Sequence, residues 1–459
     1  MATLLQTPRS WPKVTLGRVT ADGELLPFPR AEKAGAWAAW RQVVDRESPD
    51  TVIRLIGQAG LRGRGGAGFR AADKWWRCQA TESSQRYVVA NGFEADPGTF
   101  TDRLLMERDP HAVIEGVAIA AYAVGATKAI VAVNAGYARA IERLRGAIAQ
   151  AEEAGLVGID AMDGGLTLEI EVRPVQGAFL LGEETVLLRA LEGKRGMPEQ
   201  RPPYPAERGL FGKPTLVHNV ETLATVPWIV TNGPAAFAAI GTARGREKAG
   251  SPGTKLVQLA GAVARPGVAE VPLGTTLGEI VERAGGGMRD GVKLKLAIVG
   301  GPLGGLLPAD RMDLTLDFES LREAGATLGS GSIVVADESA CAVDLGRLLE
   351  RFASDEACGK TIPCRIGLKR LVEIADRFAA GHHRPQDREL LVDLSNDVIA
   401  SGLCNHERLA PDPLLSGLRY FAAEYDAHIH EGRCPAGVCH PVTVAPSATA
   451  AEKKARVSA

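Results

Sequence analysis

Residues 109–134 read DPHAVIEGVAIAAYAVGATKAIVAVN, a stretch that predicts one buried helix followed by one buried strand. Asp109 and Pro110 begin the helix, because an aspartate caps the first free amides and a proline fits the first turn. Apolar residues then recur at helical spacing, and AIVAV at 129–133 is a continuous apolar run typical of a buried strand. Helices and strands alternate in this way over residues 50–250, which predicts an α/β sandwich with a largely parallel sheet.

The chain changes character twice after this region. Residues 251–335 begin with two extended runs joined at Arg-Pro-Gly, followed by one helix and the strand LKLAIVG, which predict a small β-grasp domain. Residues 336–425 contain leucine-rich helical segments with short connections, a pattern typical of a four-helix bundle. An N-terminal extension at 1–49 and a tail rich in cysteine and histidine at 426–459 complete the expected organisation.

Composition narrows the class of protein. The chain has 459 residues, 45% of them hydrophobic and 24% charged, and is too long for one hydrophobic core. Its formal net charge is −2 with both signs interspersed, so a nucleic-acid partner is not expected. No apolar run reaches the ~18 residues of a membrane span, and the first residues lack the apolar block of a signal peptide. We therefore expect a cytoplasmic protein without direct membrane insertion.

A glycine-rich loop follows the first apolar segment of the α/β region. Residues 60–69 read GLRGRGGAGF, with five glycines and two arginines. Glycines let the backbone approach a phosphate closely with its N–H groups turned inward, and arginine neutralises the charge. The spacing is neither that of a P-loop nor G-x-G-x-x-G, so the loop alone is compatible with a phosphate site or with a simple turn.

Three further blocks accompany this loop: ANGFEADPGTFTDRLLMERDPHAVIEG at 90–116, GAFLLGEETVLLRALEGKRGMPEQRPPYPAERGLFGKPTLVHNVETL at 177–223, and CGKTIPCRIG at 358–367. Together with the loop they resemble the flavin-carrying, NADH-oxidising subunit of respiratory complex I and its relatives in NAD-linked hydrogenases and formate dehydrogenases. The resemblance implies NADH bound above FMN, hydride transfer to the flavin, and electrons that leave singly through a [4Fe-4S] cluster.

The resemblance also implies a set of cofactor-binding residues. The FMN phosphate loop is matched by Gly63, Arg64, Gly65, Gly66 and Lys74. Flavin contacts are matched by Asn91, Gly182, Glu183, Glu184, Asn219 and Thr222. Dinucleotide contacts are matched by Phe69, Lys74, Glu94, Asp96, Phe179, Glu184 and Tyr204, with Glu94 and Glu184 as the expected catalytic residues. The same two carboxylates would repel a 2′-phosphate, which favours NADH over NADPH.

Several positions depart from the family pattern. Phe93 and Ala95 stand where an aspartate and a serine near the flavin are usual, and His218 replaces the first of two asparagines. Arg77 occupies the place of an aromatic residue that helps to hold NADH. Phosphate binding is therefore expected to be better preserved than recognition of the flavin ring.

The iron–sulfur motif lacks one of its cysteines. The family pattern is C-x2-C-x2-C with a fourth cysteine some forty residues later, and this chain supplies Cys358, Cys364 and Cys404 with Thr361 at the second place. A cubane cluster takes four anionic ligands, normally thiolates, and a threonine hydroxyl keeps its proton at neutral pH. Three outcomes fit: a three-iron cluster or a four-iron cluster with one water ligand, completion by a side chain other than cysteine, or no cluster.

A second group of metal-binding residue types lies near the C-terminus. Residues 428–440 read HIHEGRCPAGVCH, and the chain has seven cysteines, an odd number that fits metal ligands better than disulfides. Cys341, His428, Cys434 and Cys439 are the types that zinc prefers, so we expect them to form a structural zinc site. The alternative is an exposed turn with reduced thiols. The tail resembles that of NADH-binding subunits of bifurcating hydrogenases.

The sequence therefore predicts an NADH:acceptor oxidoreductase subunit with FMN, a 4Fe-4S or 3Fe-4S cluster and structural zinc. Its expected partners are NADH, a separate thioredoxin-like 2Fe-2S subunit and further redox subunits of a complex. Two alternatives stay open at this point. One is an FMN-dependent NAD(P)H dehydrogenase that has lost its cluster, and the other is a non-catalytic structural paralogue within a complex.

Overall fold

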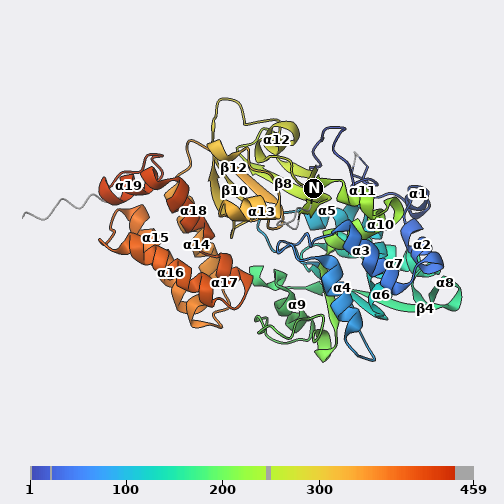
Figure 1. Cartoon of the computed structure of the whole chain (residues 1–459). Coiled ribbons are helices and arrows are strands. Elements are labelled where there is room, and N and C mark those ends of the chain that lie inside the picture. Colours follow the sequence, from blue (N-terminus) through green and yellow to red (C-terminus); the bar gives the residue numbers. More distant parts are fainter. Residues whose placement is uncertain (1–2, 21–22, 244–249, 440–459) are drawn as a thin grey trace, which may run out of the picture.

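The computed structural model describes residues 3–20, 23–243 and 250–439. Figure 1 shows an α/β domain at the right, a smaller domain built on a second sheet at the top, and a group of helices at the left. The three parts follow one another along the chain, so the architecture agrees with the order expected from the sequence. Most of the C-terminal tail, from residue 440 onward, lies outside the described residues.

The α/β domain is built on a five-stranded sheet in the order β3-β4-β2-β1-β5. The strands are β1 (Tyr87–Gly92), β2 (Lys128–Asn134), β3 (Gly158–Asp160), β4 (Leu166–Val175) and β5 (Thr215–Asn219). β1, β2, β4 and β5 run parallel, and only the edge strand β3 is antiparallel. The carboxyl ends of β1 and β5 therefore meet at one edge of the sheet, where open α/β folds bind ligands.

Helices cover this sheet. They are α3 (Pro49–Ala59), α4 (Ala71–Ala80), α5 (Thr101–Arg108), α6 (Pro110–Val124), α7 (Ala138–Glu153), α8 (Ala161–Gly164), α9 (Glu184–Leu191), α10 (Val220–Asn232) and α11 (Pro234–Ala238), with 3-10 turns at Phe179–Gly182 and Leu210–Gly212. The helix predicted to begin at Pro110 is α6: the Asp109 carboxylate accepts the N–H of Ala112 at 3.1 Å, and Gly125 ends it with φ +72°. The predicted strand at 129–133 is the core of β2.

The first residues of the chain pack against both sheets. α1 (Phe28–Lys33) and α2 (Ala38–Arg46) lie on the α/β domain, and Trp40 is buried in its core. The N–H groups of Val14, Thr15 and Leu16 donate to the buried Glu270 carboxylate in the second domain, at 2.8, 2.9 and 2.9 Å. This segment therefore joins the two domains.

The second domain contains a five-stranded sheet in the order β11-β10-β12-β8-β9. Its strands are β8 (Thr254–Gly261), β9 (Gly267–Pro272), β10 (Leu294–Val299), β11 (Gly305–Pro308) and β12 (Ser332–Asp337), preceded by the short β6 (Gly241–Thr242) and β7 (Ser251–Pro252). Thr276 forms a capping box for α12 (Leu277–Glu279), which widens to a π-turn at Ile280–Ala284. A 3-10 turn at Ala309–Arg311 and α13 (Phe318–Glu323) complete the domain. The predicted hairpin, helix and strand are present, and β11 and β12 are additional.

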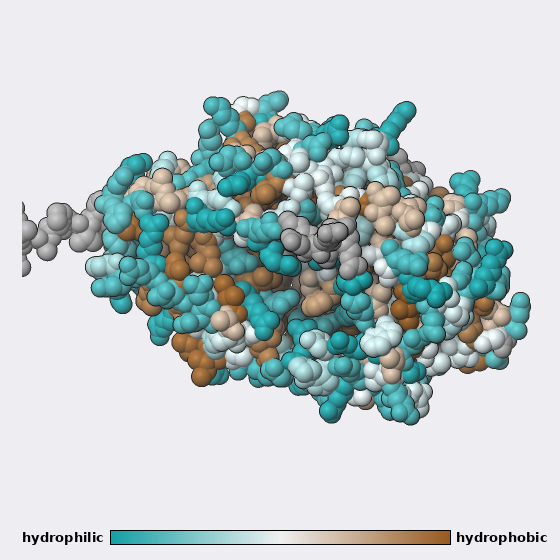
Figure 2. Space-filling view, in the orientation of Figure 1, coloured by the Kyte–Doolittle hydropathy of each residue, from teal (hydrophilic) through white to brown (hydrophobic). Residues whose placement is uncertain are grey.

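The C-terminal bundle contains α14 (Ala342–Asp355), α15 (Leu368–Ala380), α16 (Asp387–Ser401), α17 (Asn405–Leu409), α18 (Asp412–Tyr420) and α19 (Ala422–His430), with a π-turn at Pro363–Gly367. The bundle was expected to have four helices, but the helical run that begins at Asp412 is interrupted at Phe421, where φ is −121°, and continues as α19. In Figure 2, apolar atoms gather over this bundle at the left of the view. No helix among the described residues is long and apolar enough to cross a membrane.

A buried ion pair joins the α/β domain to the second sheet. The Lys255 ammonium of β8 contacts the Glu221 carboxylate of α10, and both side chains are almost completely buried. The second oxygen of Glu221 accepts the N–H of Leu256 at 2.8 Å. Both oxygens of the Glu221 carboxylate are therefore bound by β8, one by the Lys255 ammonium and the other by the N–H of Leu256. These two contacts fix the position of β8 against α10.

Candidate flavin, iron–sulfur and zinc sites

The glycine-rich loop lies between α3 and α4, against the carboxyl end of β5. A Cβ atom at Gly65 would come within 2.9 Å of the Asn219 Cβ, and Gly66 has a φ of +124° that other residues rarely adopt. Among the described residues, no acceptor is found for the N–H groups of Gly65 and Gly66. The loop is therefore a cradle of free amides at the ligand-binding edge of the sheet, which fits an anionic phosphate.

Arg64 turns its side chain into the protein. Its guanidinium donates to the carbonyl oxygens of Pro252 at 2.7 Å and Arg62 at 3.2 Å, and burial lowers its pKa to about 10. Its backbone N–H donates to the Thr222 hydroxyl at 2.8 Å. Both Arg64 and Thr222 therefore brace the loop, and the groups of the loop that have no partner among the described residues are backbone amides.

Lys74, Glu184 and Arg201 form a charge network beside this loop. Lys74 Nζ lies 2.7 Å from one oxygen of Glu184, and an Arg201 nitrogen lies 2.9 Å from the other. Burial alone would raise the pKa of Glu184, but the two cations outweigh it and lower that pKa. Lys74 also donates to the carbonyl oxygen of Val217 at 2.9 Å, which ties the network to β5. Arg201 was not among the residues expected from the sequence.

Amide side chains at the ends of β1 and β5 point to neighbouring elements. Asn91 Nδ2 donates to the carbonyl oxygen of Gly182 at 3.0 Å. Asn219 Nδ2 donates to Asp102 at 2.6 Å, and its Oδ1 accepts the N–H of Glu221 at 2.9 Å. These contacts hold Asn219 rigidly under the glycine-rich loop.

Three acidic residues predicted to contact cofactors already cap helices or bridge loops. Glu183 accepts the N–H groups at the start of α9, and Glu94, with a φ of +48°, accepts those of Asp102 and Arg103 at 2.9 and 3.0 Å. Burial raises the pKa of Glu94, against the effect of these hydrogen bonds. Asp96 accepts the hydroxyl of Ser330 from the second domain, and burial raises its pKa also. The second domain therefore contacts the loop that follows the carboxyl end of β1.

The predicted aromatic residues divide into two groups. Phe69 and Tyr204 are 59% and 40% exposed, so their rings are free to stack on a ligand, and the Arg77 guanidinium lies 4.9 Å from the Tyr204 ring centroid. The Phe179 ring instead packs edge-on against Phe352 of the bundle, with the centroids 5.2 Å apart. Phe179 is therefore the partly buried member of the predicted set, held by the bundle, and Phe69 and Tyr204 are its exposed members.

The iron–sulfur motif lies where the bundle meets the α/β domain. Cys358, Cys364 and Cys404 line one small pocket together with Pro198, Lys360, Thr361, Leu403 and Glu407. Burial raises the pKa of Cys364 to about 12 and that of Cys404 to about 11, so both thiols stay protonated at neutral pH until a cation binds. Cys404 also packs in one apolar cluster with Phe93 and Leu181. Three converging thiols fit an iron–sulfur group next to the flavin-binding edge.

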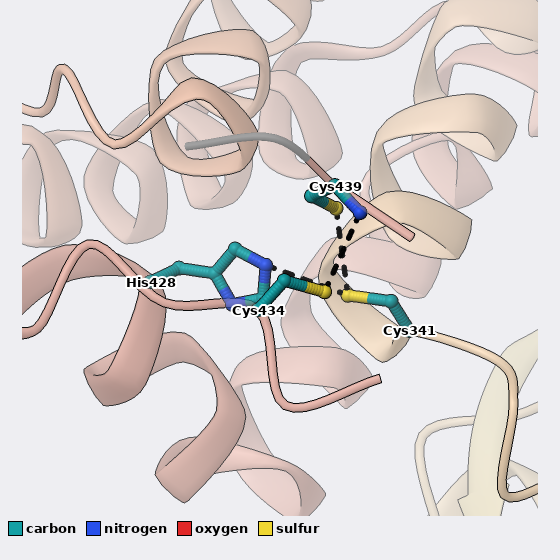
Figure 3. A group of neighbouring side chains, drawn as sticks. All are labelled: Cys341, His428, Cys434 and Cys439. Carbon is teal, nitrogen blue, oxygen red and sulfur yellow. Dashed lines mark hydrogen bonds between the residues drawn. The ribbon is translucent and has the colours of Figure 1, made fainter. Parts of the chain in front are cut away.

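The four predicted zinc ligands lie together as expected: Cys341, His428, Cys434 and Cys439 (Figure 3). Cys341 precedes the first helix of the bundle, whereas the other three lie in or after its last helix. Their ligand atoms all lie within 4.8 Å of one another, with 3.6 Å between Cys341 Sγ and His428 Nε2. A tetrahedral zinc ion with arms of about 2.0–2.3 Å places its ligands about 3.5–3.8 Å apart. Three sulfurs and one nitrogen at these separations fit a zinc ion.

The surroundings of this group also suit a metal. His428 Nδ1 lies 2.8 Å from the carbonyl oxygen of Glu424, the contact that leaves Nε2 unprotonated and directed at the other ligands. Burial tends to raise the pKa of Cys434, but the N–H groups of Cys439 and Val438 lower it to about 6. One thiolate is therefore available at neutral pH to begin metal binding.

Three family models match the chain. The Nuo51 FMN-binding domain matches residues 56–228, the SLBB domain matches residues 256–307, and the NADH-ubiquinone oxidoreductase-F iron-sulfur binding region matches residues 344–428. Their order is that of the α/β domain, the second sheet and the bundle.

Curated relatives cover almost the whole chain. The HndC subunit of the NADP-reducing hydrogenase of Solidesulfovibrio fructosivorans is 44% identical over 85% of this chain and 79% of its own length. An NADH-quinone oxidoreductase subunit of Rhizobium meliloti is 42% identical over 90% of this chain and 96% of its own. A crystal structure of an NAD+-reducing [NiFe]-hydrogenase in the H2-reduced state matches with a TM-score of 0.78 at 33% identity, covering 89% of this chain and 67% of that one.

These matches confirm the resemblance, the fold class, and the inference of an FMN-dependent subunit that oxidises NADH and passes electrons onward. The iron–sulfur binding region coincides with the bundle that carries the three cysteines. The chain therefore belongs to the family of flavin-binding, NADH-oxidising subunits of NADH-quinone oxidoreductase.

Proposed function

We propose that this chain binds FMN at the carboxyl ends of β1 and β5, binds NADH over it, and delivers the electrons to a separate 2Fe-2S subunit. The observation that carries the proposal is the glycine-rich loop: the N–H groups of Gly65 and Gly66 have no acceptor among the described residues, and Gly65 lies beside Asn219. In this proposal the loop holds the FMN phosphate through its backbone, and Asn91 and Gly182 contact the flavin ring. These two residues lie side by side, because Asn91 Nδ2 donates to the carbonyl oxygen of Gly182. Bound FMN supplies the chemistry that couples hydride transfer to one-electron transfer.

The remaining site residues hold and select the dinucleotide. The exposed rings of Phe69 and Tyr204 can stack on the rings of the dinucleotide. Arg77 stands where the family usually has an aromatic residue, and its planar guanidinium beside Tyr204 takes over the stacking role of that residue. Glu184 is held between Lys74 and Arg201, so these two cations offset its charge. The preference for NADH over NADPH that we propose therefore rests on direct contact of this carboxylate with the ribose, at the place where NADPH carries its 2′-phosphate.

The purified chain tests this function directly. Anaerobically purified protein should show a flavin absorption band that NADH bleaches. Protein with no bound flavin, or with flavin that NADH does not reduce, would contradict the proposal and favour a structural subunit. Bleaching by NADH in protein without iron would instead favour a dehydrogenase that reduces a diffusible acceptor.

Glu184→Gln should weaken the preference for NADH. We expect the ratio of kcat/KM for NADH to that for NADPH to fall about tenfold, equivalent to ~1.4 kcal/mol, because the repulsion of the 2′-phosphate is lost. FMN content is measured on the same samples so that the ratio is compared for flavin-loaded protein, and Glu171→Gln, an exposed glutamate of β4, serves as the control. An unchanged ratio in Glu184→Gln would show that this carboxylate does not face the dinucleotide.

A thioredoxin-like 2Fe-2S subunit is the proposed electron acceptor. The relatives come from multi-subunit enzymes, namely NADH-quinone oxidoreductase and hydrogenases, which supports a redox partner for this chain. Anaerobic mixing of the reduced chain with such a subunit should transfer electrons at a rate that depends on its concentration. A rate no faster than with a small diffusible acceptor would contradict this assignment.

We also propose that Cys341, His428, Cys434 and Cys439 bind a structural zinc ion. The group connects the residue before α14 to the end of α19, so the metal closes the bundle. Cys434→Ser should reduce zinc from about one ion per chain to less than about a tenth of that and lower the thermal stability of the bundle. FMN content should not change, and Cys78→Ala, a buried thiol of α4, is the control. Wild-type protein that contains no zinc would contradict the site.

A further inference from the structure

Glu407 is a buried carboxylate in the cysteine pocket. It lies on α17 and is only 1% exposed. The hydroxyl of Thr361, at the position of the missing thiol, donates to Glu407 Oε1 at 2.6 Å, and the N–H of Leu403 donates to Oε2 at 2.9 Å. The carboxylate therefore lies directly beside the place in the motif where the fourth thiol is absent.

No ion pair between described residues includes Glu407. The basic residues near it in the pocket or on the same helix are Lys360, His406 and Arg408, and all three engage backbone carbonyl oxygens, at 2.6, 2.8 and 2.8 Å. A buried carboxylate without a cation costs several kcal/mol, so this arrangement is unfavourable by itself. A bound cation in the pocket removes that cost.

The thiols of the pocket have the same requirement. Cys358, Cys364 and Cys404 line the same pocket as Glu407, and each binds a metal as an anionic thiolate. Three thiols and one carboxylate thus line a small pocket in which the ammonium of Lys360 donates to the carbonyl oxygen of Pro198 and forms no ion pair with Glu407 among the described residues. Iron ions balance such a set, because they bind thiolates and also accept anionic oxygen ligands.

We propose that Glu407 supplies a carboxylate oxygen as the fourth protein ligand of the iron–sulfur group held by Cys358, Cys364 and Cys404. The Thr361 hydroxyl then orients this carboxylate and is not itself a ligand. On assembly each of the three thiols releases one proton and forms an Fe–S bond, and Glu407 forms an Fe–O bond through one oxygen. No electron is gained or lost by the protein in this step. The inference takes the presence of the iron–sulfur group from the iron–sulfur binding region matched over residues 344–428 and does not depend on the proposed FMN and NADH sites.

Four forms of the full-length chain, purified without oxygen, test the assignment. Iron, acid-labile sulfide and FMN are quantified, and electron paramagnetic resonance spectra are recorded for the oxidised and the dithionite-reduced protein. Wild type should contain about four irons per FMN. Glu407→Gln should lose at least about one iron and show the signal of an oxidised three-iron cluster. Glu407→Gln combined with Thr361→Cys should regain it, because the thiol restores an anionic ligand at the same place.

Glu350→Gln is the matched control. Glu350 lies on α14 of the same bundle, is fully buried, has no hydrogen-bond partner among the described residues, and lines no part of the cysteine pocket. The same substitution there should leave iron and sulfide unchanged.

Several results would overturn the inference. They are equal iron contents and identical spectra for wild type and Glu407→Gln, a three-iron cluster or no iron in wild type, and a loss in Glu407→Gln that Thr361→Cys does not reverse. FMN content and bleaching by NADH are measured on the same samples. Failure of those two readouts contradicts the proposed function, whereas a normal flavin with an unexpected iron content contradicts the Glu407 assignment alone.

Discussion

Gly65→Val should remove FMN from the protein. A side chain at this position meets the Asn219 Cβ at 2.9 Å, and Asn219 has no freedom to move because it caps α10 and donates to Asp102 at 2.6 Å. The loop itself must therefore shift and carry its free amides away from the phosphate position. We expect FMN affinity to fall at least about a hundredfold, equivalent to ~2.7 kcal/mol, measured by fluorescence titration of the apoprotein.

Gly146→Val is the control for this substitution. Gly146 lies in α7, and a Cβ there would meet nothing within 4 Å, so the control should bind FMN as wild type does. Circular dichroism of both variants checks that the α/β domain still folds. Full flavin binding by folded Gly65→Val would place the phosphate elsewhere and remove the main support for the proposed site.

Lys255→Met should destabilise the junction between the α/β domain and the second sheet. The substitution leaves the buried Glu221 carboxylate without this ion pair, and the N–H of Leu256, at 2.8 Å, is then its one hydrogen-bond donor among the described residues. Breaking a buried pair from one side costs ~3–5 kcal/mol, because the desolvation of the remaining charge is uncompensated. We expect the first thermal transition to fall by about 10 °C.

The double variant Lys255→Met with Glu221→Gln separates charge from packing. A neutral amide still accepts the N–H of Leu256, so the double variant should recover most of the lost stability. Equal losses in the single and double variants would show that the ammonium contributes through packing alone. Lys369→Met, on the exposed surface of α15, controls for the loss of a lysine.

Local sequence patterns correctly predicted the elements whose formation depends on residues close together in the chain. The cap at Asp109, the strand at 129–133 and the order of the three folded parts are all present. Capping and periodicity act over a few residues, so they can be read without knowledge of the fold. The break at Phe421 and the strands β11 and β12 were missed, because packing against distant elements sets where such short elements begin and end.

The candidate sites also combine features that residue types predict with features that depend on the fold. The four residues of the candidate metal site were recognised because Cys and His are few and their types are selective for metals, and the structure places all four side chains together. The contacts of Arg64 with Pro252 and of Phe179 with Phe352 were not predicted, because the direction of a side chain depends on partners far away in the chain. Arg201 lacked any motif and is found only through its contact with Glu184.

The sequence by itself determined the family, the cofactor class and the absence of one cluster thiol, since these depend on residue types and their spacing. Only the tertiary structure placed Glu407 beside Thr361, 46 positions apart in the chain. Hydrogen bonding and burial are properties of positions in space, so a carboxylate that compensates for a missing thiol becomes visible only after the bundle has folded around both residues.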